Sequence, residues 1–296
     1  MGVHSRRPGL ELTVEEESSP ACDLAAHLVF EVEDDAVLAV QVAAASTRRP
    51  LRHEQLDVSL DGRPIESPME VATSRGGRVH ILRAREGTLD VRYSATVART
   101  TMQPSPVDVP GIELVHDEES LEALRQSRYC PSDRLAGFAD FEFADVPRGP
   151  DLPSAVAAWV FERIAYRSGV SDHLDTAVET LVAGEGVCRD FAHLTISLCR
   201  ALRVPARFVA VYAPGLSPMD FHAVAEARIG AGWEIVDPTR CAPRSSLVRV
   251  ATGRDAADTA FATTLRGRAA LIQCEVTAVV EGDLPADDHR SRAFLD

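Results

Sequence analysis

The most informative pattern of apolar and polar positions lies between Gly184 and Pro205. Apolar residues recur there at helical spacing and cover most of the circumference, which is typical of a core helix. Glycines before the pattern and a proline after it are common helix boundaries. We therefore predict a buried helix, with Cys188 at or just before its first turn. Its apolar positions are Phe191, Ala192, Leu194, Ile196, Leu198, Cys199, Ala201 and Leu202.

The position of Cys188 at a helix start suggests that its thiol is reactive. The thiolate is the reactive form of cysteine, and the free N–H groups at a helix N-terminus favour negative charge. The preceding glycines let the backbone approach closely and leave the sulfur uncovered. The alternative is that a small apolar side chain simply packs at the helix start.

The first hundred residues carry a different pattern, in which apolar and polar positions alternate over short stretches separated by turn residues. Several short strands of this kind predict a β-sandwich. The expected strands are 10–14, 25–32, 37–42, 56–60, 78–83 and 89–97.

Helical and strand patterns alternate after a proline-containing stretch at 101–115, which we interpret as a linker. The expected helices are 120–128, 153–167, 176–181, 188–202 and 255–265. The expected strands are 205–212, 221–229, 233–237 and 271–280, the last of which could return to the N-terminal sheet. The charged final dozen residues are expected to be mobile.

The fold class is therefore α+β, and we divide the chain into four segments. Residues 1–115 form a β-sandwich-like domain, 116–150 a connecting segment, 151–270 a catalytic core, and 271–296 a final strand with a mobile tail.

A predicted hairpin brings two further polar residues together. If it turns on Gly230 and Ala231, Val224 lies opposite Asp237, and His222 occupies the same face. A shift of one residue would separate His222 from Asp237. The helix could then present Cys188 to His222 from behind the strand.

Cys188, His222 and Asp237 would then form a nucleophile, a general base and an orienting carboxylate. Taken singly, His222 could be a hydrogen-bonded strand histidine and Asp237 a turn residue before Pro238. The three residues are explained together by one arrangement, which favours the catalytic interpretation.

Composition argues against several classes of partner and cofactor. A net charge of −14 argues against non-specific binding of nucleic acid or anionic membranes. The cysteines and histidines lack zinc spacing, so we expect no metal or other cofactor. Neither a signal peptide nor an apolar run long enough to span a membrane is expected, and the cytoplasm follows as the default location.

The residues at 186–194, 201–208, 221–223 and 232–239 together resemble the core of the transglutaminase-like superfamily, in the expected order. Bacterial members with a β-rich N-terminal region look most similar. The resemblance implies a papain-like core, a thioester acyl-enzyme, and Cys188, His222 and Asp237 as the triad. It also implies chemistry without a metal and a peptide, protein or small amide as substrate. Val224 departs from the family, in which many members carry an aromatic residue there.

These observations predict a cysteine-dependent amide hydrolase or acyltransferase. The alternatives are a binding module that keeps the fold without turnover, and a structural role for Cys188. The backbone N–H of Cys188 is the candidate oxyanion donor. Side candidates are interpreted as structural, namely Asp190 and His193 as buried polar groups with partners, Cys199 as inert, Cys241 as structural, and Trp233 as hairpin core.

Overall fold

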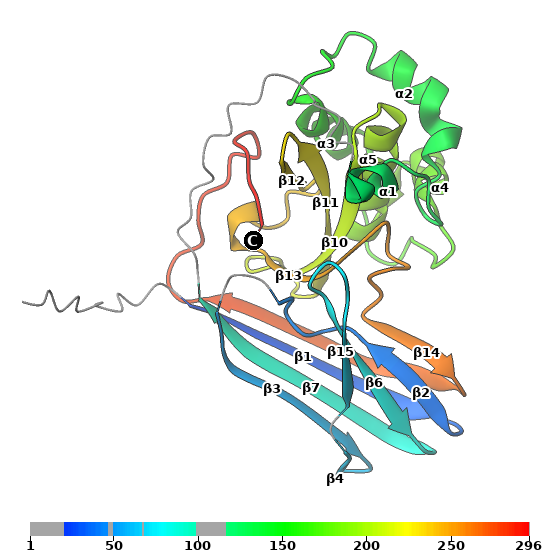
Figure 1. Cartoon of the computed structure of the whole chain (residues 1–296), viewed down its shortest axis with the longest axis vertical. Coiled ribbons are helices and arrows are strands. Elements are labelled where there is room, and N and C mark those ends of the chain that lie inside the picture. The colour runs from blue at the N-terminus through cyan, green and yellow to red at the C-terminus, as the bar shows by residue number, and fades with distance from the viewer. Residues whose placement is uncertain (1–20, 47–49, 67, 99–116, 296) are drawn as a thin grey trace, which may run out of the picture.

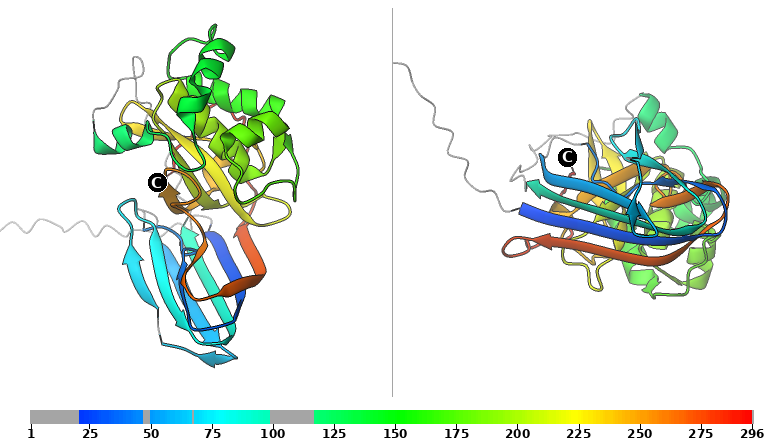
Figure 2. Two further views of the ribbon diagram at one scale, coloured as in Figure 1. Left: turned by 90° about the vertical axis from the view of Figure 1, so that its right-hand side faces the viewer. Right: turned by 90° about the horizontal axis from the view of Figure 1, so that it is seen from below.

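The computed structural model describes residues 21–46, 50–66, 68–98 and 117–295. Figure 1 shows two parts, which lie one above the other in the view of Figure 2, left. The β-rich half contains β1 to β7 together with β14 and β15. The helical half contains α1 to α5 and β8 to β13.

Two antiparallel sheets build the β-rich half. One has the order β15 (Ala269–Val280), β1 (Ala21–Val32), β7 (Gly87–Ala98), β3 (Leu51–Leu60) and β4 (Arg63–Pro64). The other has the order β14 (Ala262–Arg266), β2 (Ala36–Val40), β6 (Arg78–Ala84) and β5 (Met69–Ala72). The pairing of β15 with β1 confirms that the final strand returns to the N-terminal sheet.

Alternation along the strands decides which face of each sheet is buried. In β7, Leu89, Val91 and Tyr93 are buried and the residues between them are more exposed. These side chains share one hydrophobic cluster with Leu28 of β1 and Leu38 of β2. Because both sheets contribute to this cluster, burial of apolar surface holds them together.

The helical half is built on a third antiparallel sheet. Its order is β12 (Gly232–Val236), β11 (Phe221–Ile229), β10 (Ala206–Tyr212) and β13 (Val248–Gly253). The helices are α1 (Glu118–Ala123), α2 (Ala136–Glu142), α3 (Leu152–Arg163), α4 (Ala177–Ala183) and α5 (Cys188–Ala201), with 3-10 turns at η1 (Ser132–Leu135) and η2 (Arg244–Ser246).

The predicted central helix is α5, and all its residues from Asp190 to Ala201 are buried. One side packs on the small face of β11, where Ala223, Ala225 and Ala227 join its hydrophobic cluster. Helices α2, α3 and α4 pack around α5 (Figure 1). Small residues on β11 allow the helix to approach the sheet closely, so α5 is fixed between layers.

A buried tyrosine joins the two halves. Tyr212 of β10 donates a hydrogen bond from its hydroxyl to the Val42 carbonyl at 2.8 Å. Its ring stacks with that of Tyr93 in β7, at 6.4 Å between centroids. The backbone N–H of Ala45 also donates to the Arg249 carbonyl at 2.8 Å. The helical half is therefore packed against the β-rich half and not merely linked to it.

One expected helix is wrong. Residues 255–265 form a turn followed by β14, which pairs with β2. Asp255 Oδ1 accepts a hydrogen bond from the Ala257 N–H at 2.9 Å, which stabilises the turn. The strand that follows contains Thr263 and Thr264, and β-branched residues favour strands.

The segment after β15, expected to be mobile, contacts the helical half. The Ile235 N–H donates to the Ala293 carbonyl at 2.7 Å. Arg244 in η2 donates from Nη2 to Asp287 Oδ1 at 2.8 Å. The charges of this segment therefore make contacts within the protein. The expected strand at 10–14 and the linker at 101–115 lie outside the described residues, and the domain limits stay predictions.

Candidate functional site

The thiol of Cys188 stands at the first residue of α5, as predicted. The turn before it is held by Asp190, whose Oδ2 accepts a hydrogen bond from the Val187 N–H at 2.9 Å. A Cβ atom on Gly186 would lie only 2.7 Å from the Cβ of Asp190. Glycine is thus required for this close approach, and Asp190 fixes the backbone that leads into the nucleophile.

The β11–β12 hairpin has the predicted register. Ile229 pairs with Gly232, which leaves Gly230 and Ala231 as the turn, and Gly230 has a φ of 55° that favours glycine. Continuing the pairing of Ala225 with Val236 by one residue brings Asp237 opposite Val224. The hairpin therefore places Asp237 on the same face as His222.

The side chains of His222 and Asp237 are fully buried and hydrogen-bonded, with 3.3 Å between His222 Nε2 and Asp237 Oδ2. Thr239, to which no separate role was assigned from the sequence, completes this arrangement. Its backbone N–H and its hydroxyl donate to Asp237 Oδ1 at 2.9 and 2.7 Å. Its place two residues after Asp237 was the available signal, because hydroxyl side chains often close such turns.

His222 and Asp237 determine the charge at the site. Burial opposes protonation of His222, but Asp237 outweighs it and, with Cys188, raises the pKa of the imidazole well above its usual value. Burial also opposes ionisation of Asp237, but His222 and Thr239 lower the pKa of this carboxyl below its usual value. The pair is therefore an imidazolium and a carboxylate at neutral pH.

The second ring nitrogen of His222 is the atom left for chemistry. Nδ1 is buried and has no hydrogen-bond partner among the described residues. Cys188 interacts with this imidazole strongly enough to raise its pKa. Since Nε2 faces Asp237, Nδ1 is the nitrogen available to exchange a proton with the thiol.

A cavity of about 580 Å³ opens next to these residues, and both Cys188 and His222 line it. Its walls come from α5, the first residues of β11, and the segment from Ala256 to Thr263. Tyr129, which lies just before η1, also lines it. A volume of this size is typical of a binding pocket for a small molecule or a few side chains.

Tyr166 in β8 (Ala165–Tyr166) borders the thiol from another direction. It pairs with Gly186 in β9 (Glu185–Gly186), and its ring centroid lies 5.7 Å from that of Phe191. Burial raises the pKa of the Tyr166 hydroxyl, and the thiols of Cys188 and Cys241 raise it further. Tyr166 is therefore close to Cys188.

His193 is a buried polar group with a loop partner, as predicted. Its Nε2 accepts a hydrogen bond from the Ala256 N–H at 3.2 Å, and its ring stacks on Tyr129 at 5.1 Å. Burial, together with Arg189 and Arg200, holds its pKa well below the usual value. A neutral ring suits this acceptor role.

The two other residues considered from the sequence, Cys199 and Trp233, lie in different surroundings. Cys199 is buried, which raises the pKa of its thiol to about 12 and keeps it protonated at neutral pH. Trp233, expected in the hairpin core, instead carries two guanidinium groups over its ring, with Arg207 3.9 Å and Arg228 5.3 Å from the centroid. Its indole N–H donates to Glu119 at 3.2 Å, so the ring is held by polar partners.

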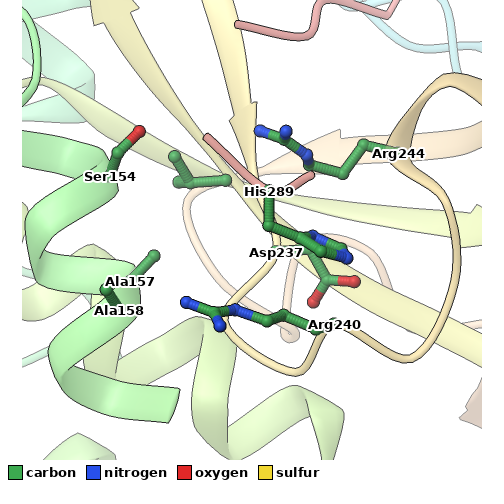
Figure 3. A pocket seen from close by; sticks show the side chains of 8 residues that line it. Ser154, Ala157, Ala158, Asp237, Arg240, Arg244 and His289 are labelled. Carbon is green, nitrogen blue, oxygen red and sulfur yellow. The ribbon is translucent and has the colours of Figure 1, made fainter. Parts of the chain in front are cut away.

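Asp237 also borders a second, much smaller cavity of about 10 Å³, drawn in Figure 3. Arg240 and Arg244 extend toward it beside His289, and Ser154 of α3 faces them across the gap. A space of this size holds about one water molecule. Of these two cavities, the larger one beside Cys188 has room for a ligand.

Within the described ranges, no group of three or more His, Cys, Asp or Glu side chains is placed to hold a metal ion. Over the same ranges, none of the helices has the length and apolarity needed to cross a membrane.

Comparisons with known proteins concern the family and the fold. The model of the transglutaminase-like superfamily matches residues 144–238, which include Cys188, His222 and Asp237. A solved structure from Cytophaga hutchinsonii, provisionally described as a cysteine protease, is 32% identical. It covers 93% of this chain and 98% of its own, with a TM-score of 0.81.

A curated relative, the uncharacterized protein ML0607 of Mycobacterium leprae, is 27% identical over 191 residues. The match covers 60% of this chain and 68% of that protein. The family model, the shared architecture along nearly the whole chain and the grouping of Cys188 with His222 lead to one conclusion: the chain belongs to the transglutaminase-like superfamily.

Proposed function

We propose that this protein is a cysteine-dependent amide hydrolase or acyltransferase that acts through Cys188, His222 and Asp237. One observation carries the proposal. The buried ring of His222 bonds Asp237 through Nε2, leaves Nδ1 without a partner among the described residues, and lines the same cavity as Cys188. This is the arrangement that a thiol nucleophile with an oriented base requires.

In the first half of the reaction, His222 already holds the proton of the Cys188 thiol on Nδ1 as an imidazolium, and the Cys188 thiolate attacks the amide carbonyl. The oxyanion that forms can receive a hydrogen bond from the backbone N–H of Cys188. When the C–N bond breaks, His222 returns its proton to the leaving amine, and a thioester remains on Cys188. Asp237 stabilises the imidazolium during these steps.

In the second half, a nucleophile attacks the thioester while His222 removes its proton. The C–S bond then breaks and Cys188 leaves as a thiolate, which restores its pair with the protonated His222. Attack by water releases an acid, whereas attack by an amine forms a new amide. Peptides, proteins and small amides are all substrates of the required chemistry.

The β-rich half, which we interpret as a β-sandwich domain, contributes to this function through β14. Ala262 and Thr263 of that strand line the cavity beside Cys188. A cytoplasmic location stays a prediction.

The decisive test measures alkylation of Cys188 by iodoacetamide between pH 5 and 9, with site-specific detection by mass spectrometry. We expect fast labelling below pH 7, because an imidazolium beside a thiol favours the thiolate. His222→Ala should slow that labelling by about tenfold or more. Cys274 in β15 is an internal control, since the partial burial of its exposed side chain raises the pKa of the thiol to about 11.

The proposal fails if Cys188 labelling rises only near pH ~8.5, the value of a free thiol, and is the same in the His222→Ala protein. Such a result would leave a transglutaminase-like fold whose thiol is not activated.

A further inference from the structure

The cavity beside Cys188 carries positive charge although the chain as a whole has a net charge of −14. Arg128, His173 and Arg189 line it, and no Asp or Glu is among its lining residues in the described part of the chain. In a strongly acidic protein, a cavity next to the nucleophile without a carboxylate on its wall favours an anionic ligand group.

Arg128 is the least compensated of these charges. It is exposed, and its guanidinium lies over the Tyr129 ring at 5.1 Å from the centroid. It makes no ion pair with any carboxylate in the described ranges 21–46, 50–66, 68–98 and 117–295. Arg128 is therefore available to a ligand without losing an ion pair to these residues.

The other two basic side chains are partly engaged. Arg189 donates from Nη2 to the Ser171 hydroxyl and the Asp172 carbonyl at 2.7 and 2.6 Å, and its Nε lies 3.6 Å from Asp190 Oδ1. His173 Nδ1 lies 3.1 Å from Asp172 Oδ1. These contacts hold Arg189 in place at the cavity.

Three carboxylates adjoin residues that line the cavity, and each has hydrogen-bond partners other than Arg128. Asp190 accepts from the Val187 N–H, and Asp172 accepts from the Leu174 N–H at 2.8 Å. Asp255 accepts from the Tyr129 and Ala257 N–H groups, each at 2.9 Å. Within the described ranges none of the three pairs with Arg128, so Arg128 can pair with a ligand without breaking a contact to them.

The rest of the cavity wall is apolar. Phe208, Phe221 and Phe261 contribute aromatic surface, and alanines at 210, 223, 256, 257, 260 and 262 leave space between them. The Phe221 and Phe261 rings stack at 5.3 Å between centroids, which gives one wall a defined shape. Such a surface accepts a bulky apolar side chain.

We infer that the substrate is a peptide segment in which an Asp or Glu side chain adjoins a bulky apolar residue. The apolar side chain enters the cavity, and the acidic one pairs with Arg128, which thereby determines specificity. This inference rests on the proposed function, since it concerns the substrate of the same thiol.

Capped peptidyl chloromethyl ketones test the inference directly, because they report which side chains the cavity accepts. The thiolate of Cys188 forms a bond to the ketone's methylene carbon as chloride leaves. Phe is combined with Glu, Gln or Lys in both orders, and the rate of Cys188 labelling is measured for each ketone. Raising the salt concentration should reduce any charge preference, because Arg128 is exposed.

We expect the Glu ketone to label Cys188 about two- to fivefold faster than the Gln ketone, the size of effect that exposed ion pairs give. Arg128→Gln should abolish this preference, and Arg128→Glu should favour the Lys ketone. Arg125→Gln is the matched control, because it removes the same charge from an exposed side chain that does not line the cavity. The Arg125→Gln protein should prefer the Glu ketone over the Gln ketone to the same degree as the wild type.

Equal labelling by the Glu, Gln and Lys ketones, unchanged in Arg128→Glu, would overturn the inference while leaving the proposed function intact. If no ketone labelled Cys188 faster than the exposed Cys274, the proposed function itself would fail. A neutral peptide ketone with a succinyl cap completes the series. A preference for that cap alone would show that the cavity takes a carboxylate beyond the side chains of the peptide, and would overturn the acidic side chain.

Discussion

Asp237 shows how single residues set the proton balance of the site. Its carboxylate is fully buried and receives three hydrogen bonds, from His222 Nε2 and from the N–H and hydroxyl of Thr239. A buried carboxylate without such partners would be neutral. Because it stays charged, Asp237 holds the ring of His222 in its protonated form.

Replacing Asp237 by Asn should therefore act through His222. We expect kcat/KM to fall by about 10²- to 10⁴-fold on any peptide that proves to be a substrate, as for loss of the orienting carboxylate in other triads. The pKa of His222 should fall toward its usual value. Rapid alkylation of Cys188 below pH 7 should then be lost, which the iodoacetamide profile measures.

The same substitution should change how stability depends on pH. Since folding raises the pKa of His222, its protonation stabilises the wild type fully below pH ~6.5, and this contribution is lost as pH rises through the raised value. Asp237→Asn should remove this dependence. Thr239→Val keeps the charge of Asp237 and should change the pH dependence of stability much less. If the two substitutions changed this pH dependence equally, the proposed role of Asp237 would be contradicted.

At the scale of elements, the turn before α5 determines where the thiol stands. Gly186→Ala would force its new methyl group against Asp190, whose Cβ lies 2.7 Å from the ideal position. We expect a loss of about 1–3 kcal/mol in unfolding free energy, as for other overpacked sites. Cys188 alkylation should also slow, because the Val187–Asp190 hydrogen bond would be displaced.

Gly137 in α2 provides the matched control, since a Cβ atom there would meet nothing within 4 Å. Gly137→Ala should leave alkylation unchanged and stabilise the protein by up to about 1 kcal/mol. Thermal unfolding of both variants measures the difference. A Gly186→Ala protein as stable and as reactive as the wild type would show that the close approach is not needed.

Local signals explain which elements could be predicted from the sequence. The extent of α5 follows from apolar spacing between glycine and proline, and the β11–β12 register follows from the Gly230–Ala231 turn. The segment 255–265 was misassigned because its alanines favour a helix. Its actual state depends on pairing with β2, which lies more than two hundred residues earlier and leaves no local signal.

The cavity also could not be predicted from the sequence. Its walls combine the segment before η1, the start of α5, the start of β11 and the entry to β14. Arg128 and Phe261 carry no local sign that they meet at one site. Their role follows only from the packing of distant segments, whereas Cys188, His222 and Asp237 could be found from two local patterns.

For the whole molecule, Glu226 is a central electrostatic contact. It is fully buried in β11, accepts hydrogen bonds from Arg249 Nη2 and Nη1 at 2.6 and 3.1 Å, and accepts from Arg207 Nε at 2.7 Å. Arg207 also pairs with Glu119 in α1. This group therefore ties three strands and a distant helix together.

Glu226→Gln should leave two buried guanidinium groups undercompensated and lower the unfolding free energy by about 3–5 kcal/mol. Burial opposes ionisation of Glu226, but Arg249 and Arg207 outweigh it and lower the pKa of the carboxyl. Its contribution is present above the ordinary carboxyl pKa and is lost as pH falls through the lowered value. Denaturant unfolding from pH 3 to 7 should reveal this acid-labile component in the wild type and not in Glu226→Gln.

Glu119→Gln is the comparison variant, because Glu119 is partly exposed and its loss leaves the Glu226 contacts in place. Glu119→Gln should lower the unfolding free energy by less than about 1 kcal/mol. If Glu226→Gln and Glu119→Gln lowered the unfolding free energy by similar amounts, burial of Glu226 would not be what makes its ion pairs important.

The return of the chain to the β-rich half has a mechanical consequence. The chain crosses between the halves three times, namely after β7, before β14 and after β15, where the final segment contacts β12 and η2. A body tethered at three points that also shares a hydrophobic core with its neighbour has no single line about which it can turn freely. Because β14 is also a wall of the cavity, these connections hold the approach to Cys188 at a fixed width.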